Sequence, residues 1–279
     1  MNKKSLIQRS AKFIKIIKTD GILWALIRLL LKIFNQPNEI QRSKNKILNH
    51  LLNIHDCKVA HGEFKGMRLN KNNFWSKNDL ITYILGVYEK HVVSQLIKFS
   101  KLNNKVFIDI GAADGYFAVG MAHSKFFKKV YAFEIETLAR ENLKKNAKDN
   151  FCDNKIFINK EANFNSLKKI IDIDEISTIL IDIEGGEFEL LSKDILNLVK
   201  KCMVIIELHP NLVIDGSKKQ ERLLNICEDF FEISMIESES YNPNKFEELN
   251  QFADEDRLIS FGEGRGTNMQ WLVLVPKKN

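Results

Sequence analysis

Two apolar segments of the chain end in carboxylate and imidazole side chains whose types and spacing suit acid–base chemistry. Asp182 and Glu184 end one segment, and Glu207 and His209 end another. If each segment is a strand, alternation places both members of a pair on one face. Charged groups at the end of an apolar strand are costly to bury unless they are used. We therefore predict that Asp182, Glu184 and His209 are catalytic residues.

Histidine is the best general base near neutral pH, because its ordinary pKa is about 6.5 while a carboxylate titrates near ~4. This favours His209 as the base. Two other interpretations stand beside it. His209 can be a strand-end histidine that bonds to the backbone, and Glu184 can be the partner of a helix N-terminus that begins near Gly186.

The same four residues also suit a divalent cation. Three carboxylates and one imidazole, from Asp182, Glu184, Glu207 and His209, fit a magnesium-like or manganese-like ion. Such an ion would lower the pKa of a bound hydroxyl and remove the need for a separate base. Strand-end carboxylates often serve other purposes, so we expect a site without metal.

A second candidate site is the glycine turn that follows segment 106–110. Ligands of open α/β sheets bind at the carboxyl ends of strands, where this turn would lie. Gly111 allows a tight turn, Gly115 lets the following helix start close to a ligand, and Asp109 can accept from a cationic amino group.

The spacing of this turn argues against two common cofactors. Gly111 and Gly115 form a GxxxG spacing, which lacks the third glycine of the GxGxxG fingerprint, and the turn is not a GxxxxGKS/T phosphate loop. An NAD or ATP site is therefore disfavoured. Glu134 ends the next apolar segment, 25 residues after Asp109, where an acid can bind both ribose hydroxyls. The alternative is a solvated acid at a strand end.

These side chains must be positioned by alternating strands and helices. Apolar bursts predict seven strands, at 106–110, 129–133, 155–159, 178–183, 203–208, 232–236 and 270–275. Amphipathic stretches predict helices at 116–125, 138–149, 188–200 and 220–229. This alternation predicts an α/β fold with a seven-stranded, mostly parallel sheet and helices on both faces. Segment 237–268 is expected to be an irregular polar connection.

Charge divides the chain of 279 residues unevenly. Residues 1–50 hold eleven Lys and Arg against two acids, a net +9, and the whole chain carries +6, which leaves −3 for the remainder. We predict a basic helical extension over 1–65 and a catalytic domain over 66–279. The acidic catalytic part disfavours a nucleic-acid partner.

Residues 5–18 form an amphipathic stretch, and residues 22–34 are nearly all apolar. The second run is shorter than the ~20 residues of a spanning helix, and no small-residue cleavage site follows it. Residues 1–34 therefore either lie on a membrane surface or pack on the domain or on a second subunit of a homodimer. A further short helix is expected over 40–54. Four scattered cysteines predict neither disulfides nor zinc. We expect a cytoplasmic protein, with peripheral attachment to the inner membrane face as the alternative.

Several short motifs together resemble those of the FkbM-type methyltransferases. They are Tyr88 with Glu89, residues 107–116, residues 132–134, Leu143 with Asn146 and Asn150, and residues 181–187. The resemblance spans about residues 80–210 and implies a Rossmann-like sheet, S-adenosylmethionine as methyl donor, and O-methylation of a sugar or polyketide hydroxyl. On this resemblance Asp109, Gly111 and Glu134 are carried over as cofactor contacts. The further cofactor contacts that we expect are Ala112, Gly115, Tyr116, Asp182 and Glu89. Asp114 stands where many class I methyltransferases have glycine.

The acceptor expected from this resemblance is the hydroxyl of a sugar, glycan or natural product. A membrane lipid or lipid-linked glycan is the alternative acceptor, and a non-catalytic binding protein is the alternative to an enzyme. The Pro-Pro-aromatic turn of nucleic-acid amino-methyltransferases is missing after Asp182. Segments 1–65 and 237–268 have no matched counterpart, so the resemblance does not identify the acceptor.

Overall fold

The computed structural model describes residues 39–71, 79–102, 105–173, 176–237, 240–262 and 270–277. The amphipathic segments predicted at 5–18 and 22–34, with their membrane or subunit contact, lie outside the described residues. Among the helices that are described, none combines the length and the apolar character needed to cross a membrane.

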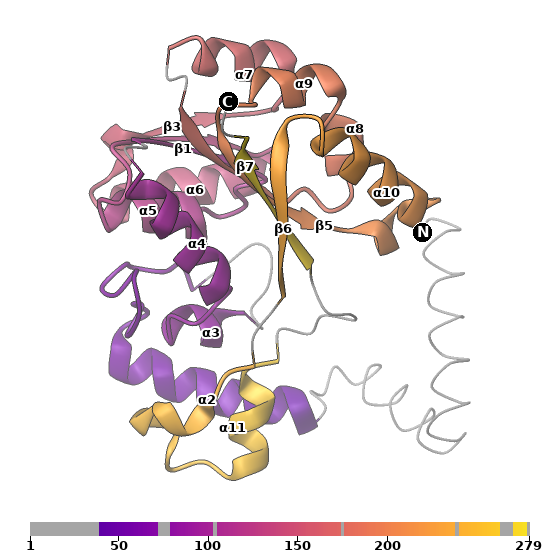
Figure 1. The fold of residues 1–279 in the computed structure, drawn as a ribbon. Helices are drawn as coiled ribbons and strands as arrows, with labels where there is room; N and C mark the ends of the chain where they lie inside the picture. The colour runs from indigo at the N-terminus through magenta and orange to yellow at the C-terminus, as the bar shows by residue number, and fades with distance from the viewer. Residues whose placement is uncertain are drawn as a thin grey trace, which may run out of the picture.

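The described chain is built on one seven-stranded sheet (Figure 1). Its strands are β1 (Val106–Ile110), β2 (Lys129–Phe133), β3 (Ile156–Asn159), β4 (Ser177–Ile181), β5 (Met203–Leu208), β6 (Phe231–Glu237) and β7 (Gln270–Pro276). They lie in the order β3-β2-β1-β4-β5-β7-β6. Strands β1 to β5 are parallel, and β7 runs antiparallel to both β5 and β6. This confirms the predicted Rossmann-like, mostly parallel sheet, although β4 ends two residues before the predicted position 183.

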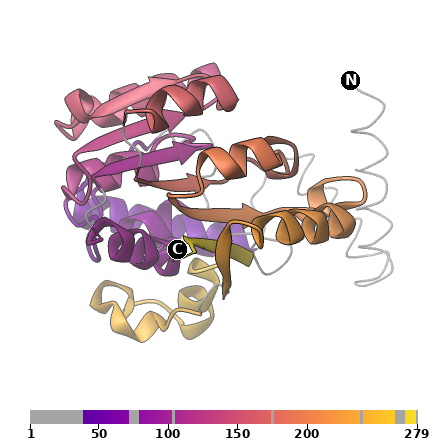
Figure 2. The same cartoon turned by 45° about the horizontal axis from the view of Figure 1, so that its top comes forward.

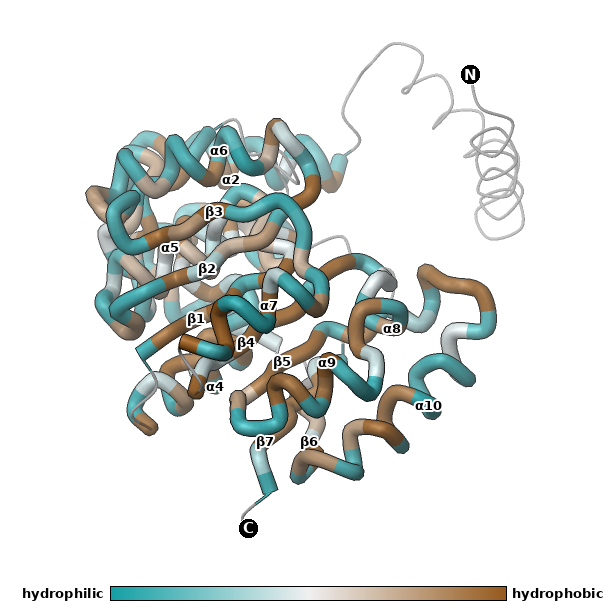
Figure 3. Tube along the Cα trace, turned by 90° about the horizontal axis from the view of Figure 1, so that it is seen from above, coloured by the Kyte–Doolittle hydropathy of each residue, from teal (hydrophilic) through white to brown (hydrophobic). Residues whose placement is uncertain are grey.

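Helices cover both faces of the sheet (Figure 2). One face packs against α4 (Lys90–Ser100), α5 (Tyr116–His123) and α6 (Thr137–Asp149). The other packs against α7 (Phe164–Ile171), α8 (Glu187–Leu190), α9 (Lys193–Leu198) and α10 (Gly216–Cys227). Seen from above, the central strands are largely brown and lie inside a shell of helices that alternate teal and brown (Figure 3). Strands buried on both faces read as continuous apolar runs, which is why the sequence reveals them.

The prediction of a single helix over 188–200 is wrong. The chain forms α8 and α9 instead, because Leu191 leaves the helical conformation and Ser192 begins a new helix by accepting the N–H of Ile195 at 3.4 Å. The helix expected over 220–229 begins earlier, at Gly216. Helix α7 was not predicted; its N-cap Asn163 and Ser166 form a reciprocal capping box.

A third apolar core lies beyond the sheet, where α2 (Glu39–His55) and α11 (Asp254–Ser260) run side by side (Figure 1). Helix α2 confirms the short helix expected over 40–54. The short helix α3 (Leu80–Ile84) joins this core, as does Leu249 of the 3-10 turn η4 (Glu247–Leu249), which follows a first such turn, η3 (Pro243–Lys245). The irregular connection expected over 237–268 is therefore wrong for its described part. Phe246, Leu249 and Phe252 of this segment are all buried in the core.

The predicted boundary between an extension and a catalytic domain at residue 65 stays a prediction. Residues on both sides of it, however, belong to the core of the sheet. Phe64 is 2% exposed and packs edge-on against Tyr116 of α5, with ring centroids 5.4 Å apart. Val59 and Met67 join the same cluster.

Candidate active site

Acidic side chains stand at the carboxyl ends of four strands that lie next to one another. They are Glu134 after β2, Asp109 on β1, Asp182 after β4 and Glu207 on β5. The residues two positions earlier in each strand all pack into the core beneath α4, α5 and α6; these are Ala132, Phe107, Leu180 and Ile205. Because side chains alternate along a strand, the four acids point to that same side of the sheet.

The glycine turn lies directly against the end of β4. Gly111 has φ +90°, and a Cβ atom placed on it would lie 1.7 Å from the carbonyl oxygen of Asp182. Gly115 also has φ +90°, but its missing side chain leaves room for Leu143 of α6, whose Cδ1 would be 2.1 Å from an added Cβ. The packing of α6 is thus one reason for glycine here. Gly115 also lines the smaller cavity, and its close approach to a ligand stays a prediction.

Glu134 holds the glycine turn in place. Its Oε2 accepts the backbone N–H of Ala113 at 2.8 Å, and its Oε1 accepts the N–H of Glu136 at 2.8 Å. Ala113 is left-handed, with φ +47°. A carboxylate oxygen has two lone pairs, so each of these oxygens keeps one for a further donor.

Asparagines on α6 and at its C-cap connect the turn to the segment that precedes the sheet. Asn146 donates to the carbonyl of Asp114 at 2.8 Å, and Asn142 donates to its carboxylate at 3.2 Å. Asn150 accepts from the N–H of Arg68 at 2.7 Å and donates to its carbonyl at 3.0 Å. Asn146 and Asn150 therefore hold the backbone of Asp114 and of Arg68 in place.

Two cavities meet at this edge of the sheet. The larger, of about 700 Å³, runs along the ends of β1, β2, β3 and β4, from Tyr83 and Gly111 past Glu134 to Glu161. The smaller, of about 70 Å³, lies between the glycine turn and residues 67–70. The residues that line both cavities are Tyr83, Tyr88, Gly111, Ala113 and Asp182. The larger volume is in the range of small-molecule and cofactor sites.

Tyrosine rings form one wall where the cavities meet. Tyr83 stacks on Tyr116 with centroids 4.3 Å apart, and Tyr88 meets both rings edge-on, at 4.6 and 5.3 Å. Burial raises the pKa of Tyr83 well above its ordinary value, and the charge of Asp79 adds to this. Sequence reasoning did not single out Tyr83, because a tyrosine in a short apolar helix resembles a core residue.

The structure brings most of the predicted cofactor contacts to a cavity wall. Those that line a cavity are Gly111, Ala112, Gly115, Tyr116, Glu134 and Asp182. Asp109 and Glu89 are not among the residues that line the two cavities; each is 2% exposed. Asp109 is bonded to the backbone N–H of Ala118, and burial, followed by the charge of Asp182, raises its pKa to about 8. Contact with a cofactor stays a prediction for all eight residues, including the six that line a cavity.

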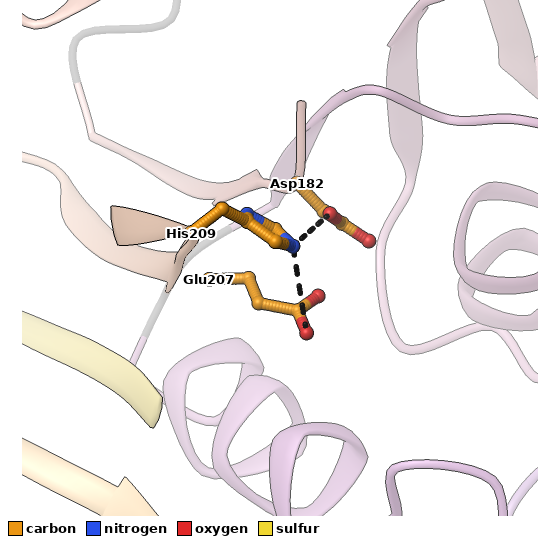
Figure 4. Close-up of side chains that lie close together, drawn as sticks. All are labelled: Asp182, Glu207 and His209. Atoms are coloured by element: carbon orange, nitrogen blue, oxygen red, sulfur yellow. Dashed lines mark ion pairs between the residues drawn. The ribbon is translucent and has the colours of Figure 1, made fainter. Parts of the chain in front are cut away.

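The four predicted strand-end residues do converge. Nε2 of His209 lies 3.7 Å from Oδ1 of Asp182, 3.7 Å from Oε2 of Glu184 and 3.8 Å from Oε1 of Glu207. Asp182 and Glu207 approach the imidazole from two sides (Figure 4). The His209 side chain is 5% exposed and Asp182 is 27% exposed. Asp182 and Glu184 line the larger cavity, and His209 lies behind them.

Glu187 is a fifth member of this group that sequence reasoning missed. Its side chain is fully buried; Oε1 accepts the backbone N–H of His209 at 2.7 Å, and Oε2 accepts that of Gly185 at 2.8 Å. The same Oε1 lies 3.5 Å from Nδ1 of His209. An acid at the start of a helix is usually a partner of the helix dipole, so its type and position gave no signal of this contact.

These contacts shift two pKa values in opposite directions. Burial acts to raise the pKa of Glu187, but the His209 side chain and backbone N–H groups outweigh it and lower that pKa. Burial acts to lower the pKa of His209, but Glu187, Asp182 and Glu184 outweigh it and raise that pKa. Each group therefore favours the charged form of the other.

Comparisons with known proteins give partial likenesses. No protein-family model matches the sequence. Over 115 residues, 40% of this chain, the sequence is 34% identical to an uncharacterized RNA methyltransferase of Fusobacterium nucleatum. The chain spans about a quarter of the length of that relative, since the match covers 24% of it.

Solved structures with a similar fold include two O-methyltransferases. An enzyme from Bacillus cereus in complex with S-adenosylhomocysteine is 10% identical, with 90% of this chain and 97% of that chain covered and a TM-score of 0.44. The Streptomyces achromogenes enzyme TomG, in complex with S-adenosylmethionine, is 11% identical, with 66% and 80% covered and a TM-score of 0.43.

Proposed function

We propose that this protein is an S-adenosylmethionine-dependent O-methyltransferase whose acceptor is a hydroxyl of a sugar, glycan or other small molecule. The observation that supports this best is the course of the larger cavity. It runs over the glycine turn, passes the carboxylate of Glu134, and meets the acidic cluster at Asp182 and Glu184. A nucleoside-binding half and an acid–base half thus share one space.

The residues along this cavity fit a sulfonium nucleoside. Glu134 keeps acceptor capacity toward the cavity after bonding the turn, which suits ribose hydroxyls. Tyr83 and Tyr88, which line the cavity, suit a positively charged sulfur, because aromatic rings attract cations. The strand order supports the exclusion of NAD, since β7 is inserted antiparallel between β5 and β6, unlike the order 3-2-1-4-5-6 of dinucleotide-binding sheets.

The partial match to an RNA methyltransferase supports methyl transfer as the reaction class. The motifs around Gly111, Glu134 and Asp182 that resemble the FkbM-type enzymes support the finer assignment to O-methylation. The exclusion of nucleic acid stays a prediction, and RNA is therefore one of the acceptors to be tested.

S-adenosylmethionine, when bound, supplies a methyl group on a positively charged sulfur. The chain must then align the acceptor oxygen and remove its proton. Alignment can contribute about 7–11 kcal/mol, and a positioned base typically 10²–10⁴-fold in rate. Asp182 and Glu184 line the cavity and can hold the acceptor hydroxyl. His209 is in contact with both, so the cluster as a unit can take up the proton.

Calorimetric titration of the purified full chain with S-adenosylmethionine tests the donor site. Glu134→Gln should weaken binding at least tenfold, because it removes the charge that bonds the turn and the ribose. Glu221→Gln, a change of an exposed acid on α10, should leave binding unchanged. Failure of the wild-type chain to bind, or equal binding by Glu134→Gln, would overturn the proposal.

A labelled-methyl assay then tests the acceptor class. Sugar and glycan fractions, lipid-linked glycans, membrane lipids and RNA from the source cell are separate arms. Label in the sugar or glycan arm supports the proposal, and label confined to lipid or RNA replaces the acceptor named here. Donor binding with no transfer in any arm would favour the non-catalytic alternative.

A further inference from the structure

The cluster at the ends of β4 and β5 has the spacing of a metal site. Ligand atoms of Asp182, Glu207 and His209 all lie within 4.8 Å of one another. Nε2 of His209 is 3.7 and 3.8 Å from the nearest oxygens of Asp182 and Glu207, beyond hydrogen-bond distance. Two atoms that each lie about 2.1 Å from one ion are separated by roughly 3.0–4.2 Å, depending on the angle between them. The observed distances fall in that range.

The imidazole is held in the orientation that a metal ligand needs. Its Nδ1 faces the fully buried carboxylate of Glu187 at 3.5 Å, and the same carboxylate anchors the backbone N–H of His209. Nε2 is left to point at Asp182 and Glu207 (Figure 4). Histidines that bind metals almost always place their second nitrogen against a carboxylate or carbonyl in this way. The His209 side chain is 5% exposed, so its imidazole cannot reorient freely.

The charge of the cluster also suits a cation. The carboxyl groups of Asp182, Glu184, Glu187 and Glu207 surround one imidazole, which brings at most one positive charge. Glu187 and Glu207 are 0% and 3% exposed, Asp182 is 27% exposed, and only Glu184, at 62%, is mostly in water. Gathering like charges away from water is costly unless an opposite charge compensates them. A divalent cation offsets two of these charges, whereas a proton on His209 offsets one.

We propose that Asp182, Glu207 and His209 bind a divalent transition-metal ion of the Mn²⁺ type, with Glu184 at its cavity side. Carboxylates suit Mg²⁺, Ca²⁺ and Mn²⁺, and imidazole suits transition metals, so a mixed set favours an ion that accepts both. Asp182 lines both cavities, so the ion would lie where they meet.

The role of this ion rests on the proposed function. An acceptor hydroxyl bound to it would have a lowered pKa, and no separate base would be needed. His209 would then be a metal ligand, and Glu187 a positioning residue that acts through it.

Titration of the metal-stripped full chain with Mn²⁺, followed by electron paramagnetic resonance and without S-adenosylmethionine, tests the site. We expect one ion per chain. Asp182→Asn and Glu207→Gln should each weaken binding more than 100-fold, and Glu187→Gln about 10–100-fold. Glu221→Gln should bind as the wild type does. Asp182 is 27% exposed, so Asp182→Asn gives the answer if the buried Glu207 variant does not fold. The absence of stoichiometric binding, or wild-type affinity in Asp182→Asn, would overturn the site.

Calorimetry with S-adenosylmethionine separates this inference from the proposed function. Donor binding and methyl transfer that persist after metal removal, in a chain that does not take up Mn²⁺, would overturn the metal site and keep the function. Mn²⁺ uptake by a chain without affinity for S-adenosylmethionine would keep the site and overturn the function.

Discussion

The carboxyl group of Asp109 makes the stability of this protein depend on pH in a way that one substitution can reveal. The residue is 2% exposed on β1, and burial together with the charge of Asp182 raises its pKa from 3.8 to about 8. The native state therefore keeps this group neutral over a range of pH in which the unfolded chain ionises it.

The sign and size of the effect follow from linkage. A pKa that is raised in the folded state contributes stability that is complete below pH ~4 and is lost as the pH rises toward 8. One pKa unit corresponds to about 1.4 kcal/mol, so the native state loses up to about 4 kcal/mol between pH 5 and pH 8 through this group. Asp109→Asn keeps the side-chain size and an oxygen that accepts from the N–H of Ala118, but it cannot ionise.

We therefore expect Asp109→Asn to gain stability relative to the wild type as the pH rises. Urea unfolding at pH 5, 6, 7 and 8 measures the free energy of unfolding of both proteins. The difference should grow by about 1.4 kcal/mol per pH unit, more slowly near pH 8, and level off above it. Asp194→Asn, a change of an exposed aspartate on α9, is the control and should show no such slope. A difference that stays constant, or that shrinks as the pH rises, would refute the reasoning.

Three further substitutions test the elements that hold the site. Gly111→Ala should destabilise the fold by about 3 kcal/mol or more in urea unfolding, because its Cβ would lie 1.7 Å from the carbonyl oxygen of Asp182 and its φ is +90°; a neutral effect would mean that the turn can move. Phe64→Ala should cost about 3–5 kcal/mol in the same assay, since the ring is 2% exposed, and a cost below ~1 kcal/mol would place Phe64 outside the core. Burial acts to raise the pKa of Glu248, but hydrogen bonds with His61, at 2.6 Å, and with His55 outweigh it and lower that pKa. A pKa that is lowered in the folded state contributes stability at neutral pH that is lost as the pH falls through that pKa. Glu248→Gln should therefore lower the free energy of unfolding by about 1 kcal/mol at pH 7 and leave it unchanged near pH 3. An equal cost at both pH values would contradict an ionic contribution.

Part of the site was predictable because it depends on local sequence. Strand ends follow from apolar runs, and the carboxyl ends of parallel strands must share one edge of the sheet. Asp182, Glu184, Glu207 and His209 were therefore expected to lie close together, and their contacts at 3.7–3.8 Å confirm it. The tight turn at Gly111 follows in the same way from a strand that runs into a glycine.

Other parts depend on packing between distant segments, which periodicity does not encode. Glu187 bonds His209 from 22 residues away, and its position at a helix start resembles a dipole partner. Tyr83 stacks on Tyr116, which is far from it in the sequence, so this contact exists only in the folded chain. The core at α2 and α11 joins segments about 200 residues apart in the sequence, and the 3-10 turns before α11 are too short to show a clear periodicity.

The sequence by itself determined the alternation of strands and helices, the glycine turn, and the set of acids at the strand ends, because these depend on residue type and on spacings of a few residues. Only the tertiary structure decided which of those acids face a cavity. Asp109 and Glu134 both stand at strand ends, yet Glu134 lines the cavity while Asp109 is covered by α5. The physical reason is that alternation along a strand sets the face of the sheet on which a side chain lies, whereas the helix packed on that face determines which side chains a ligand can reach.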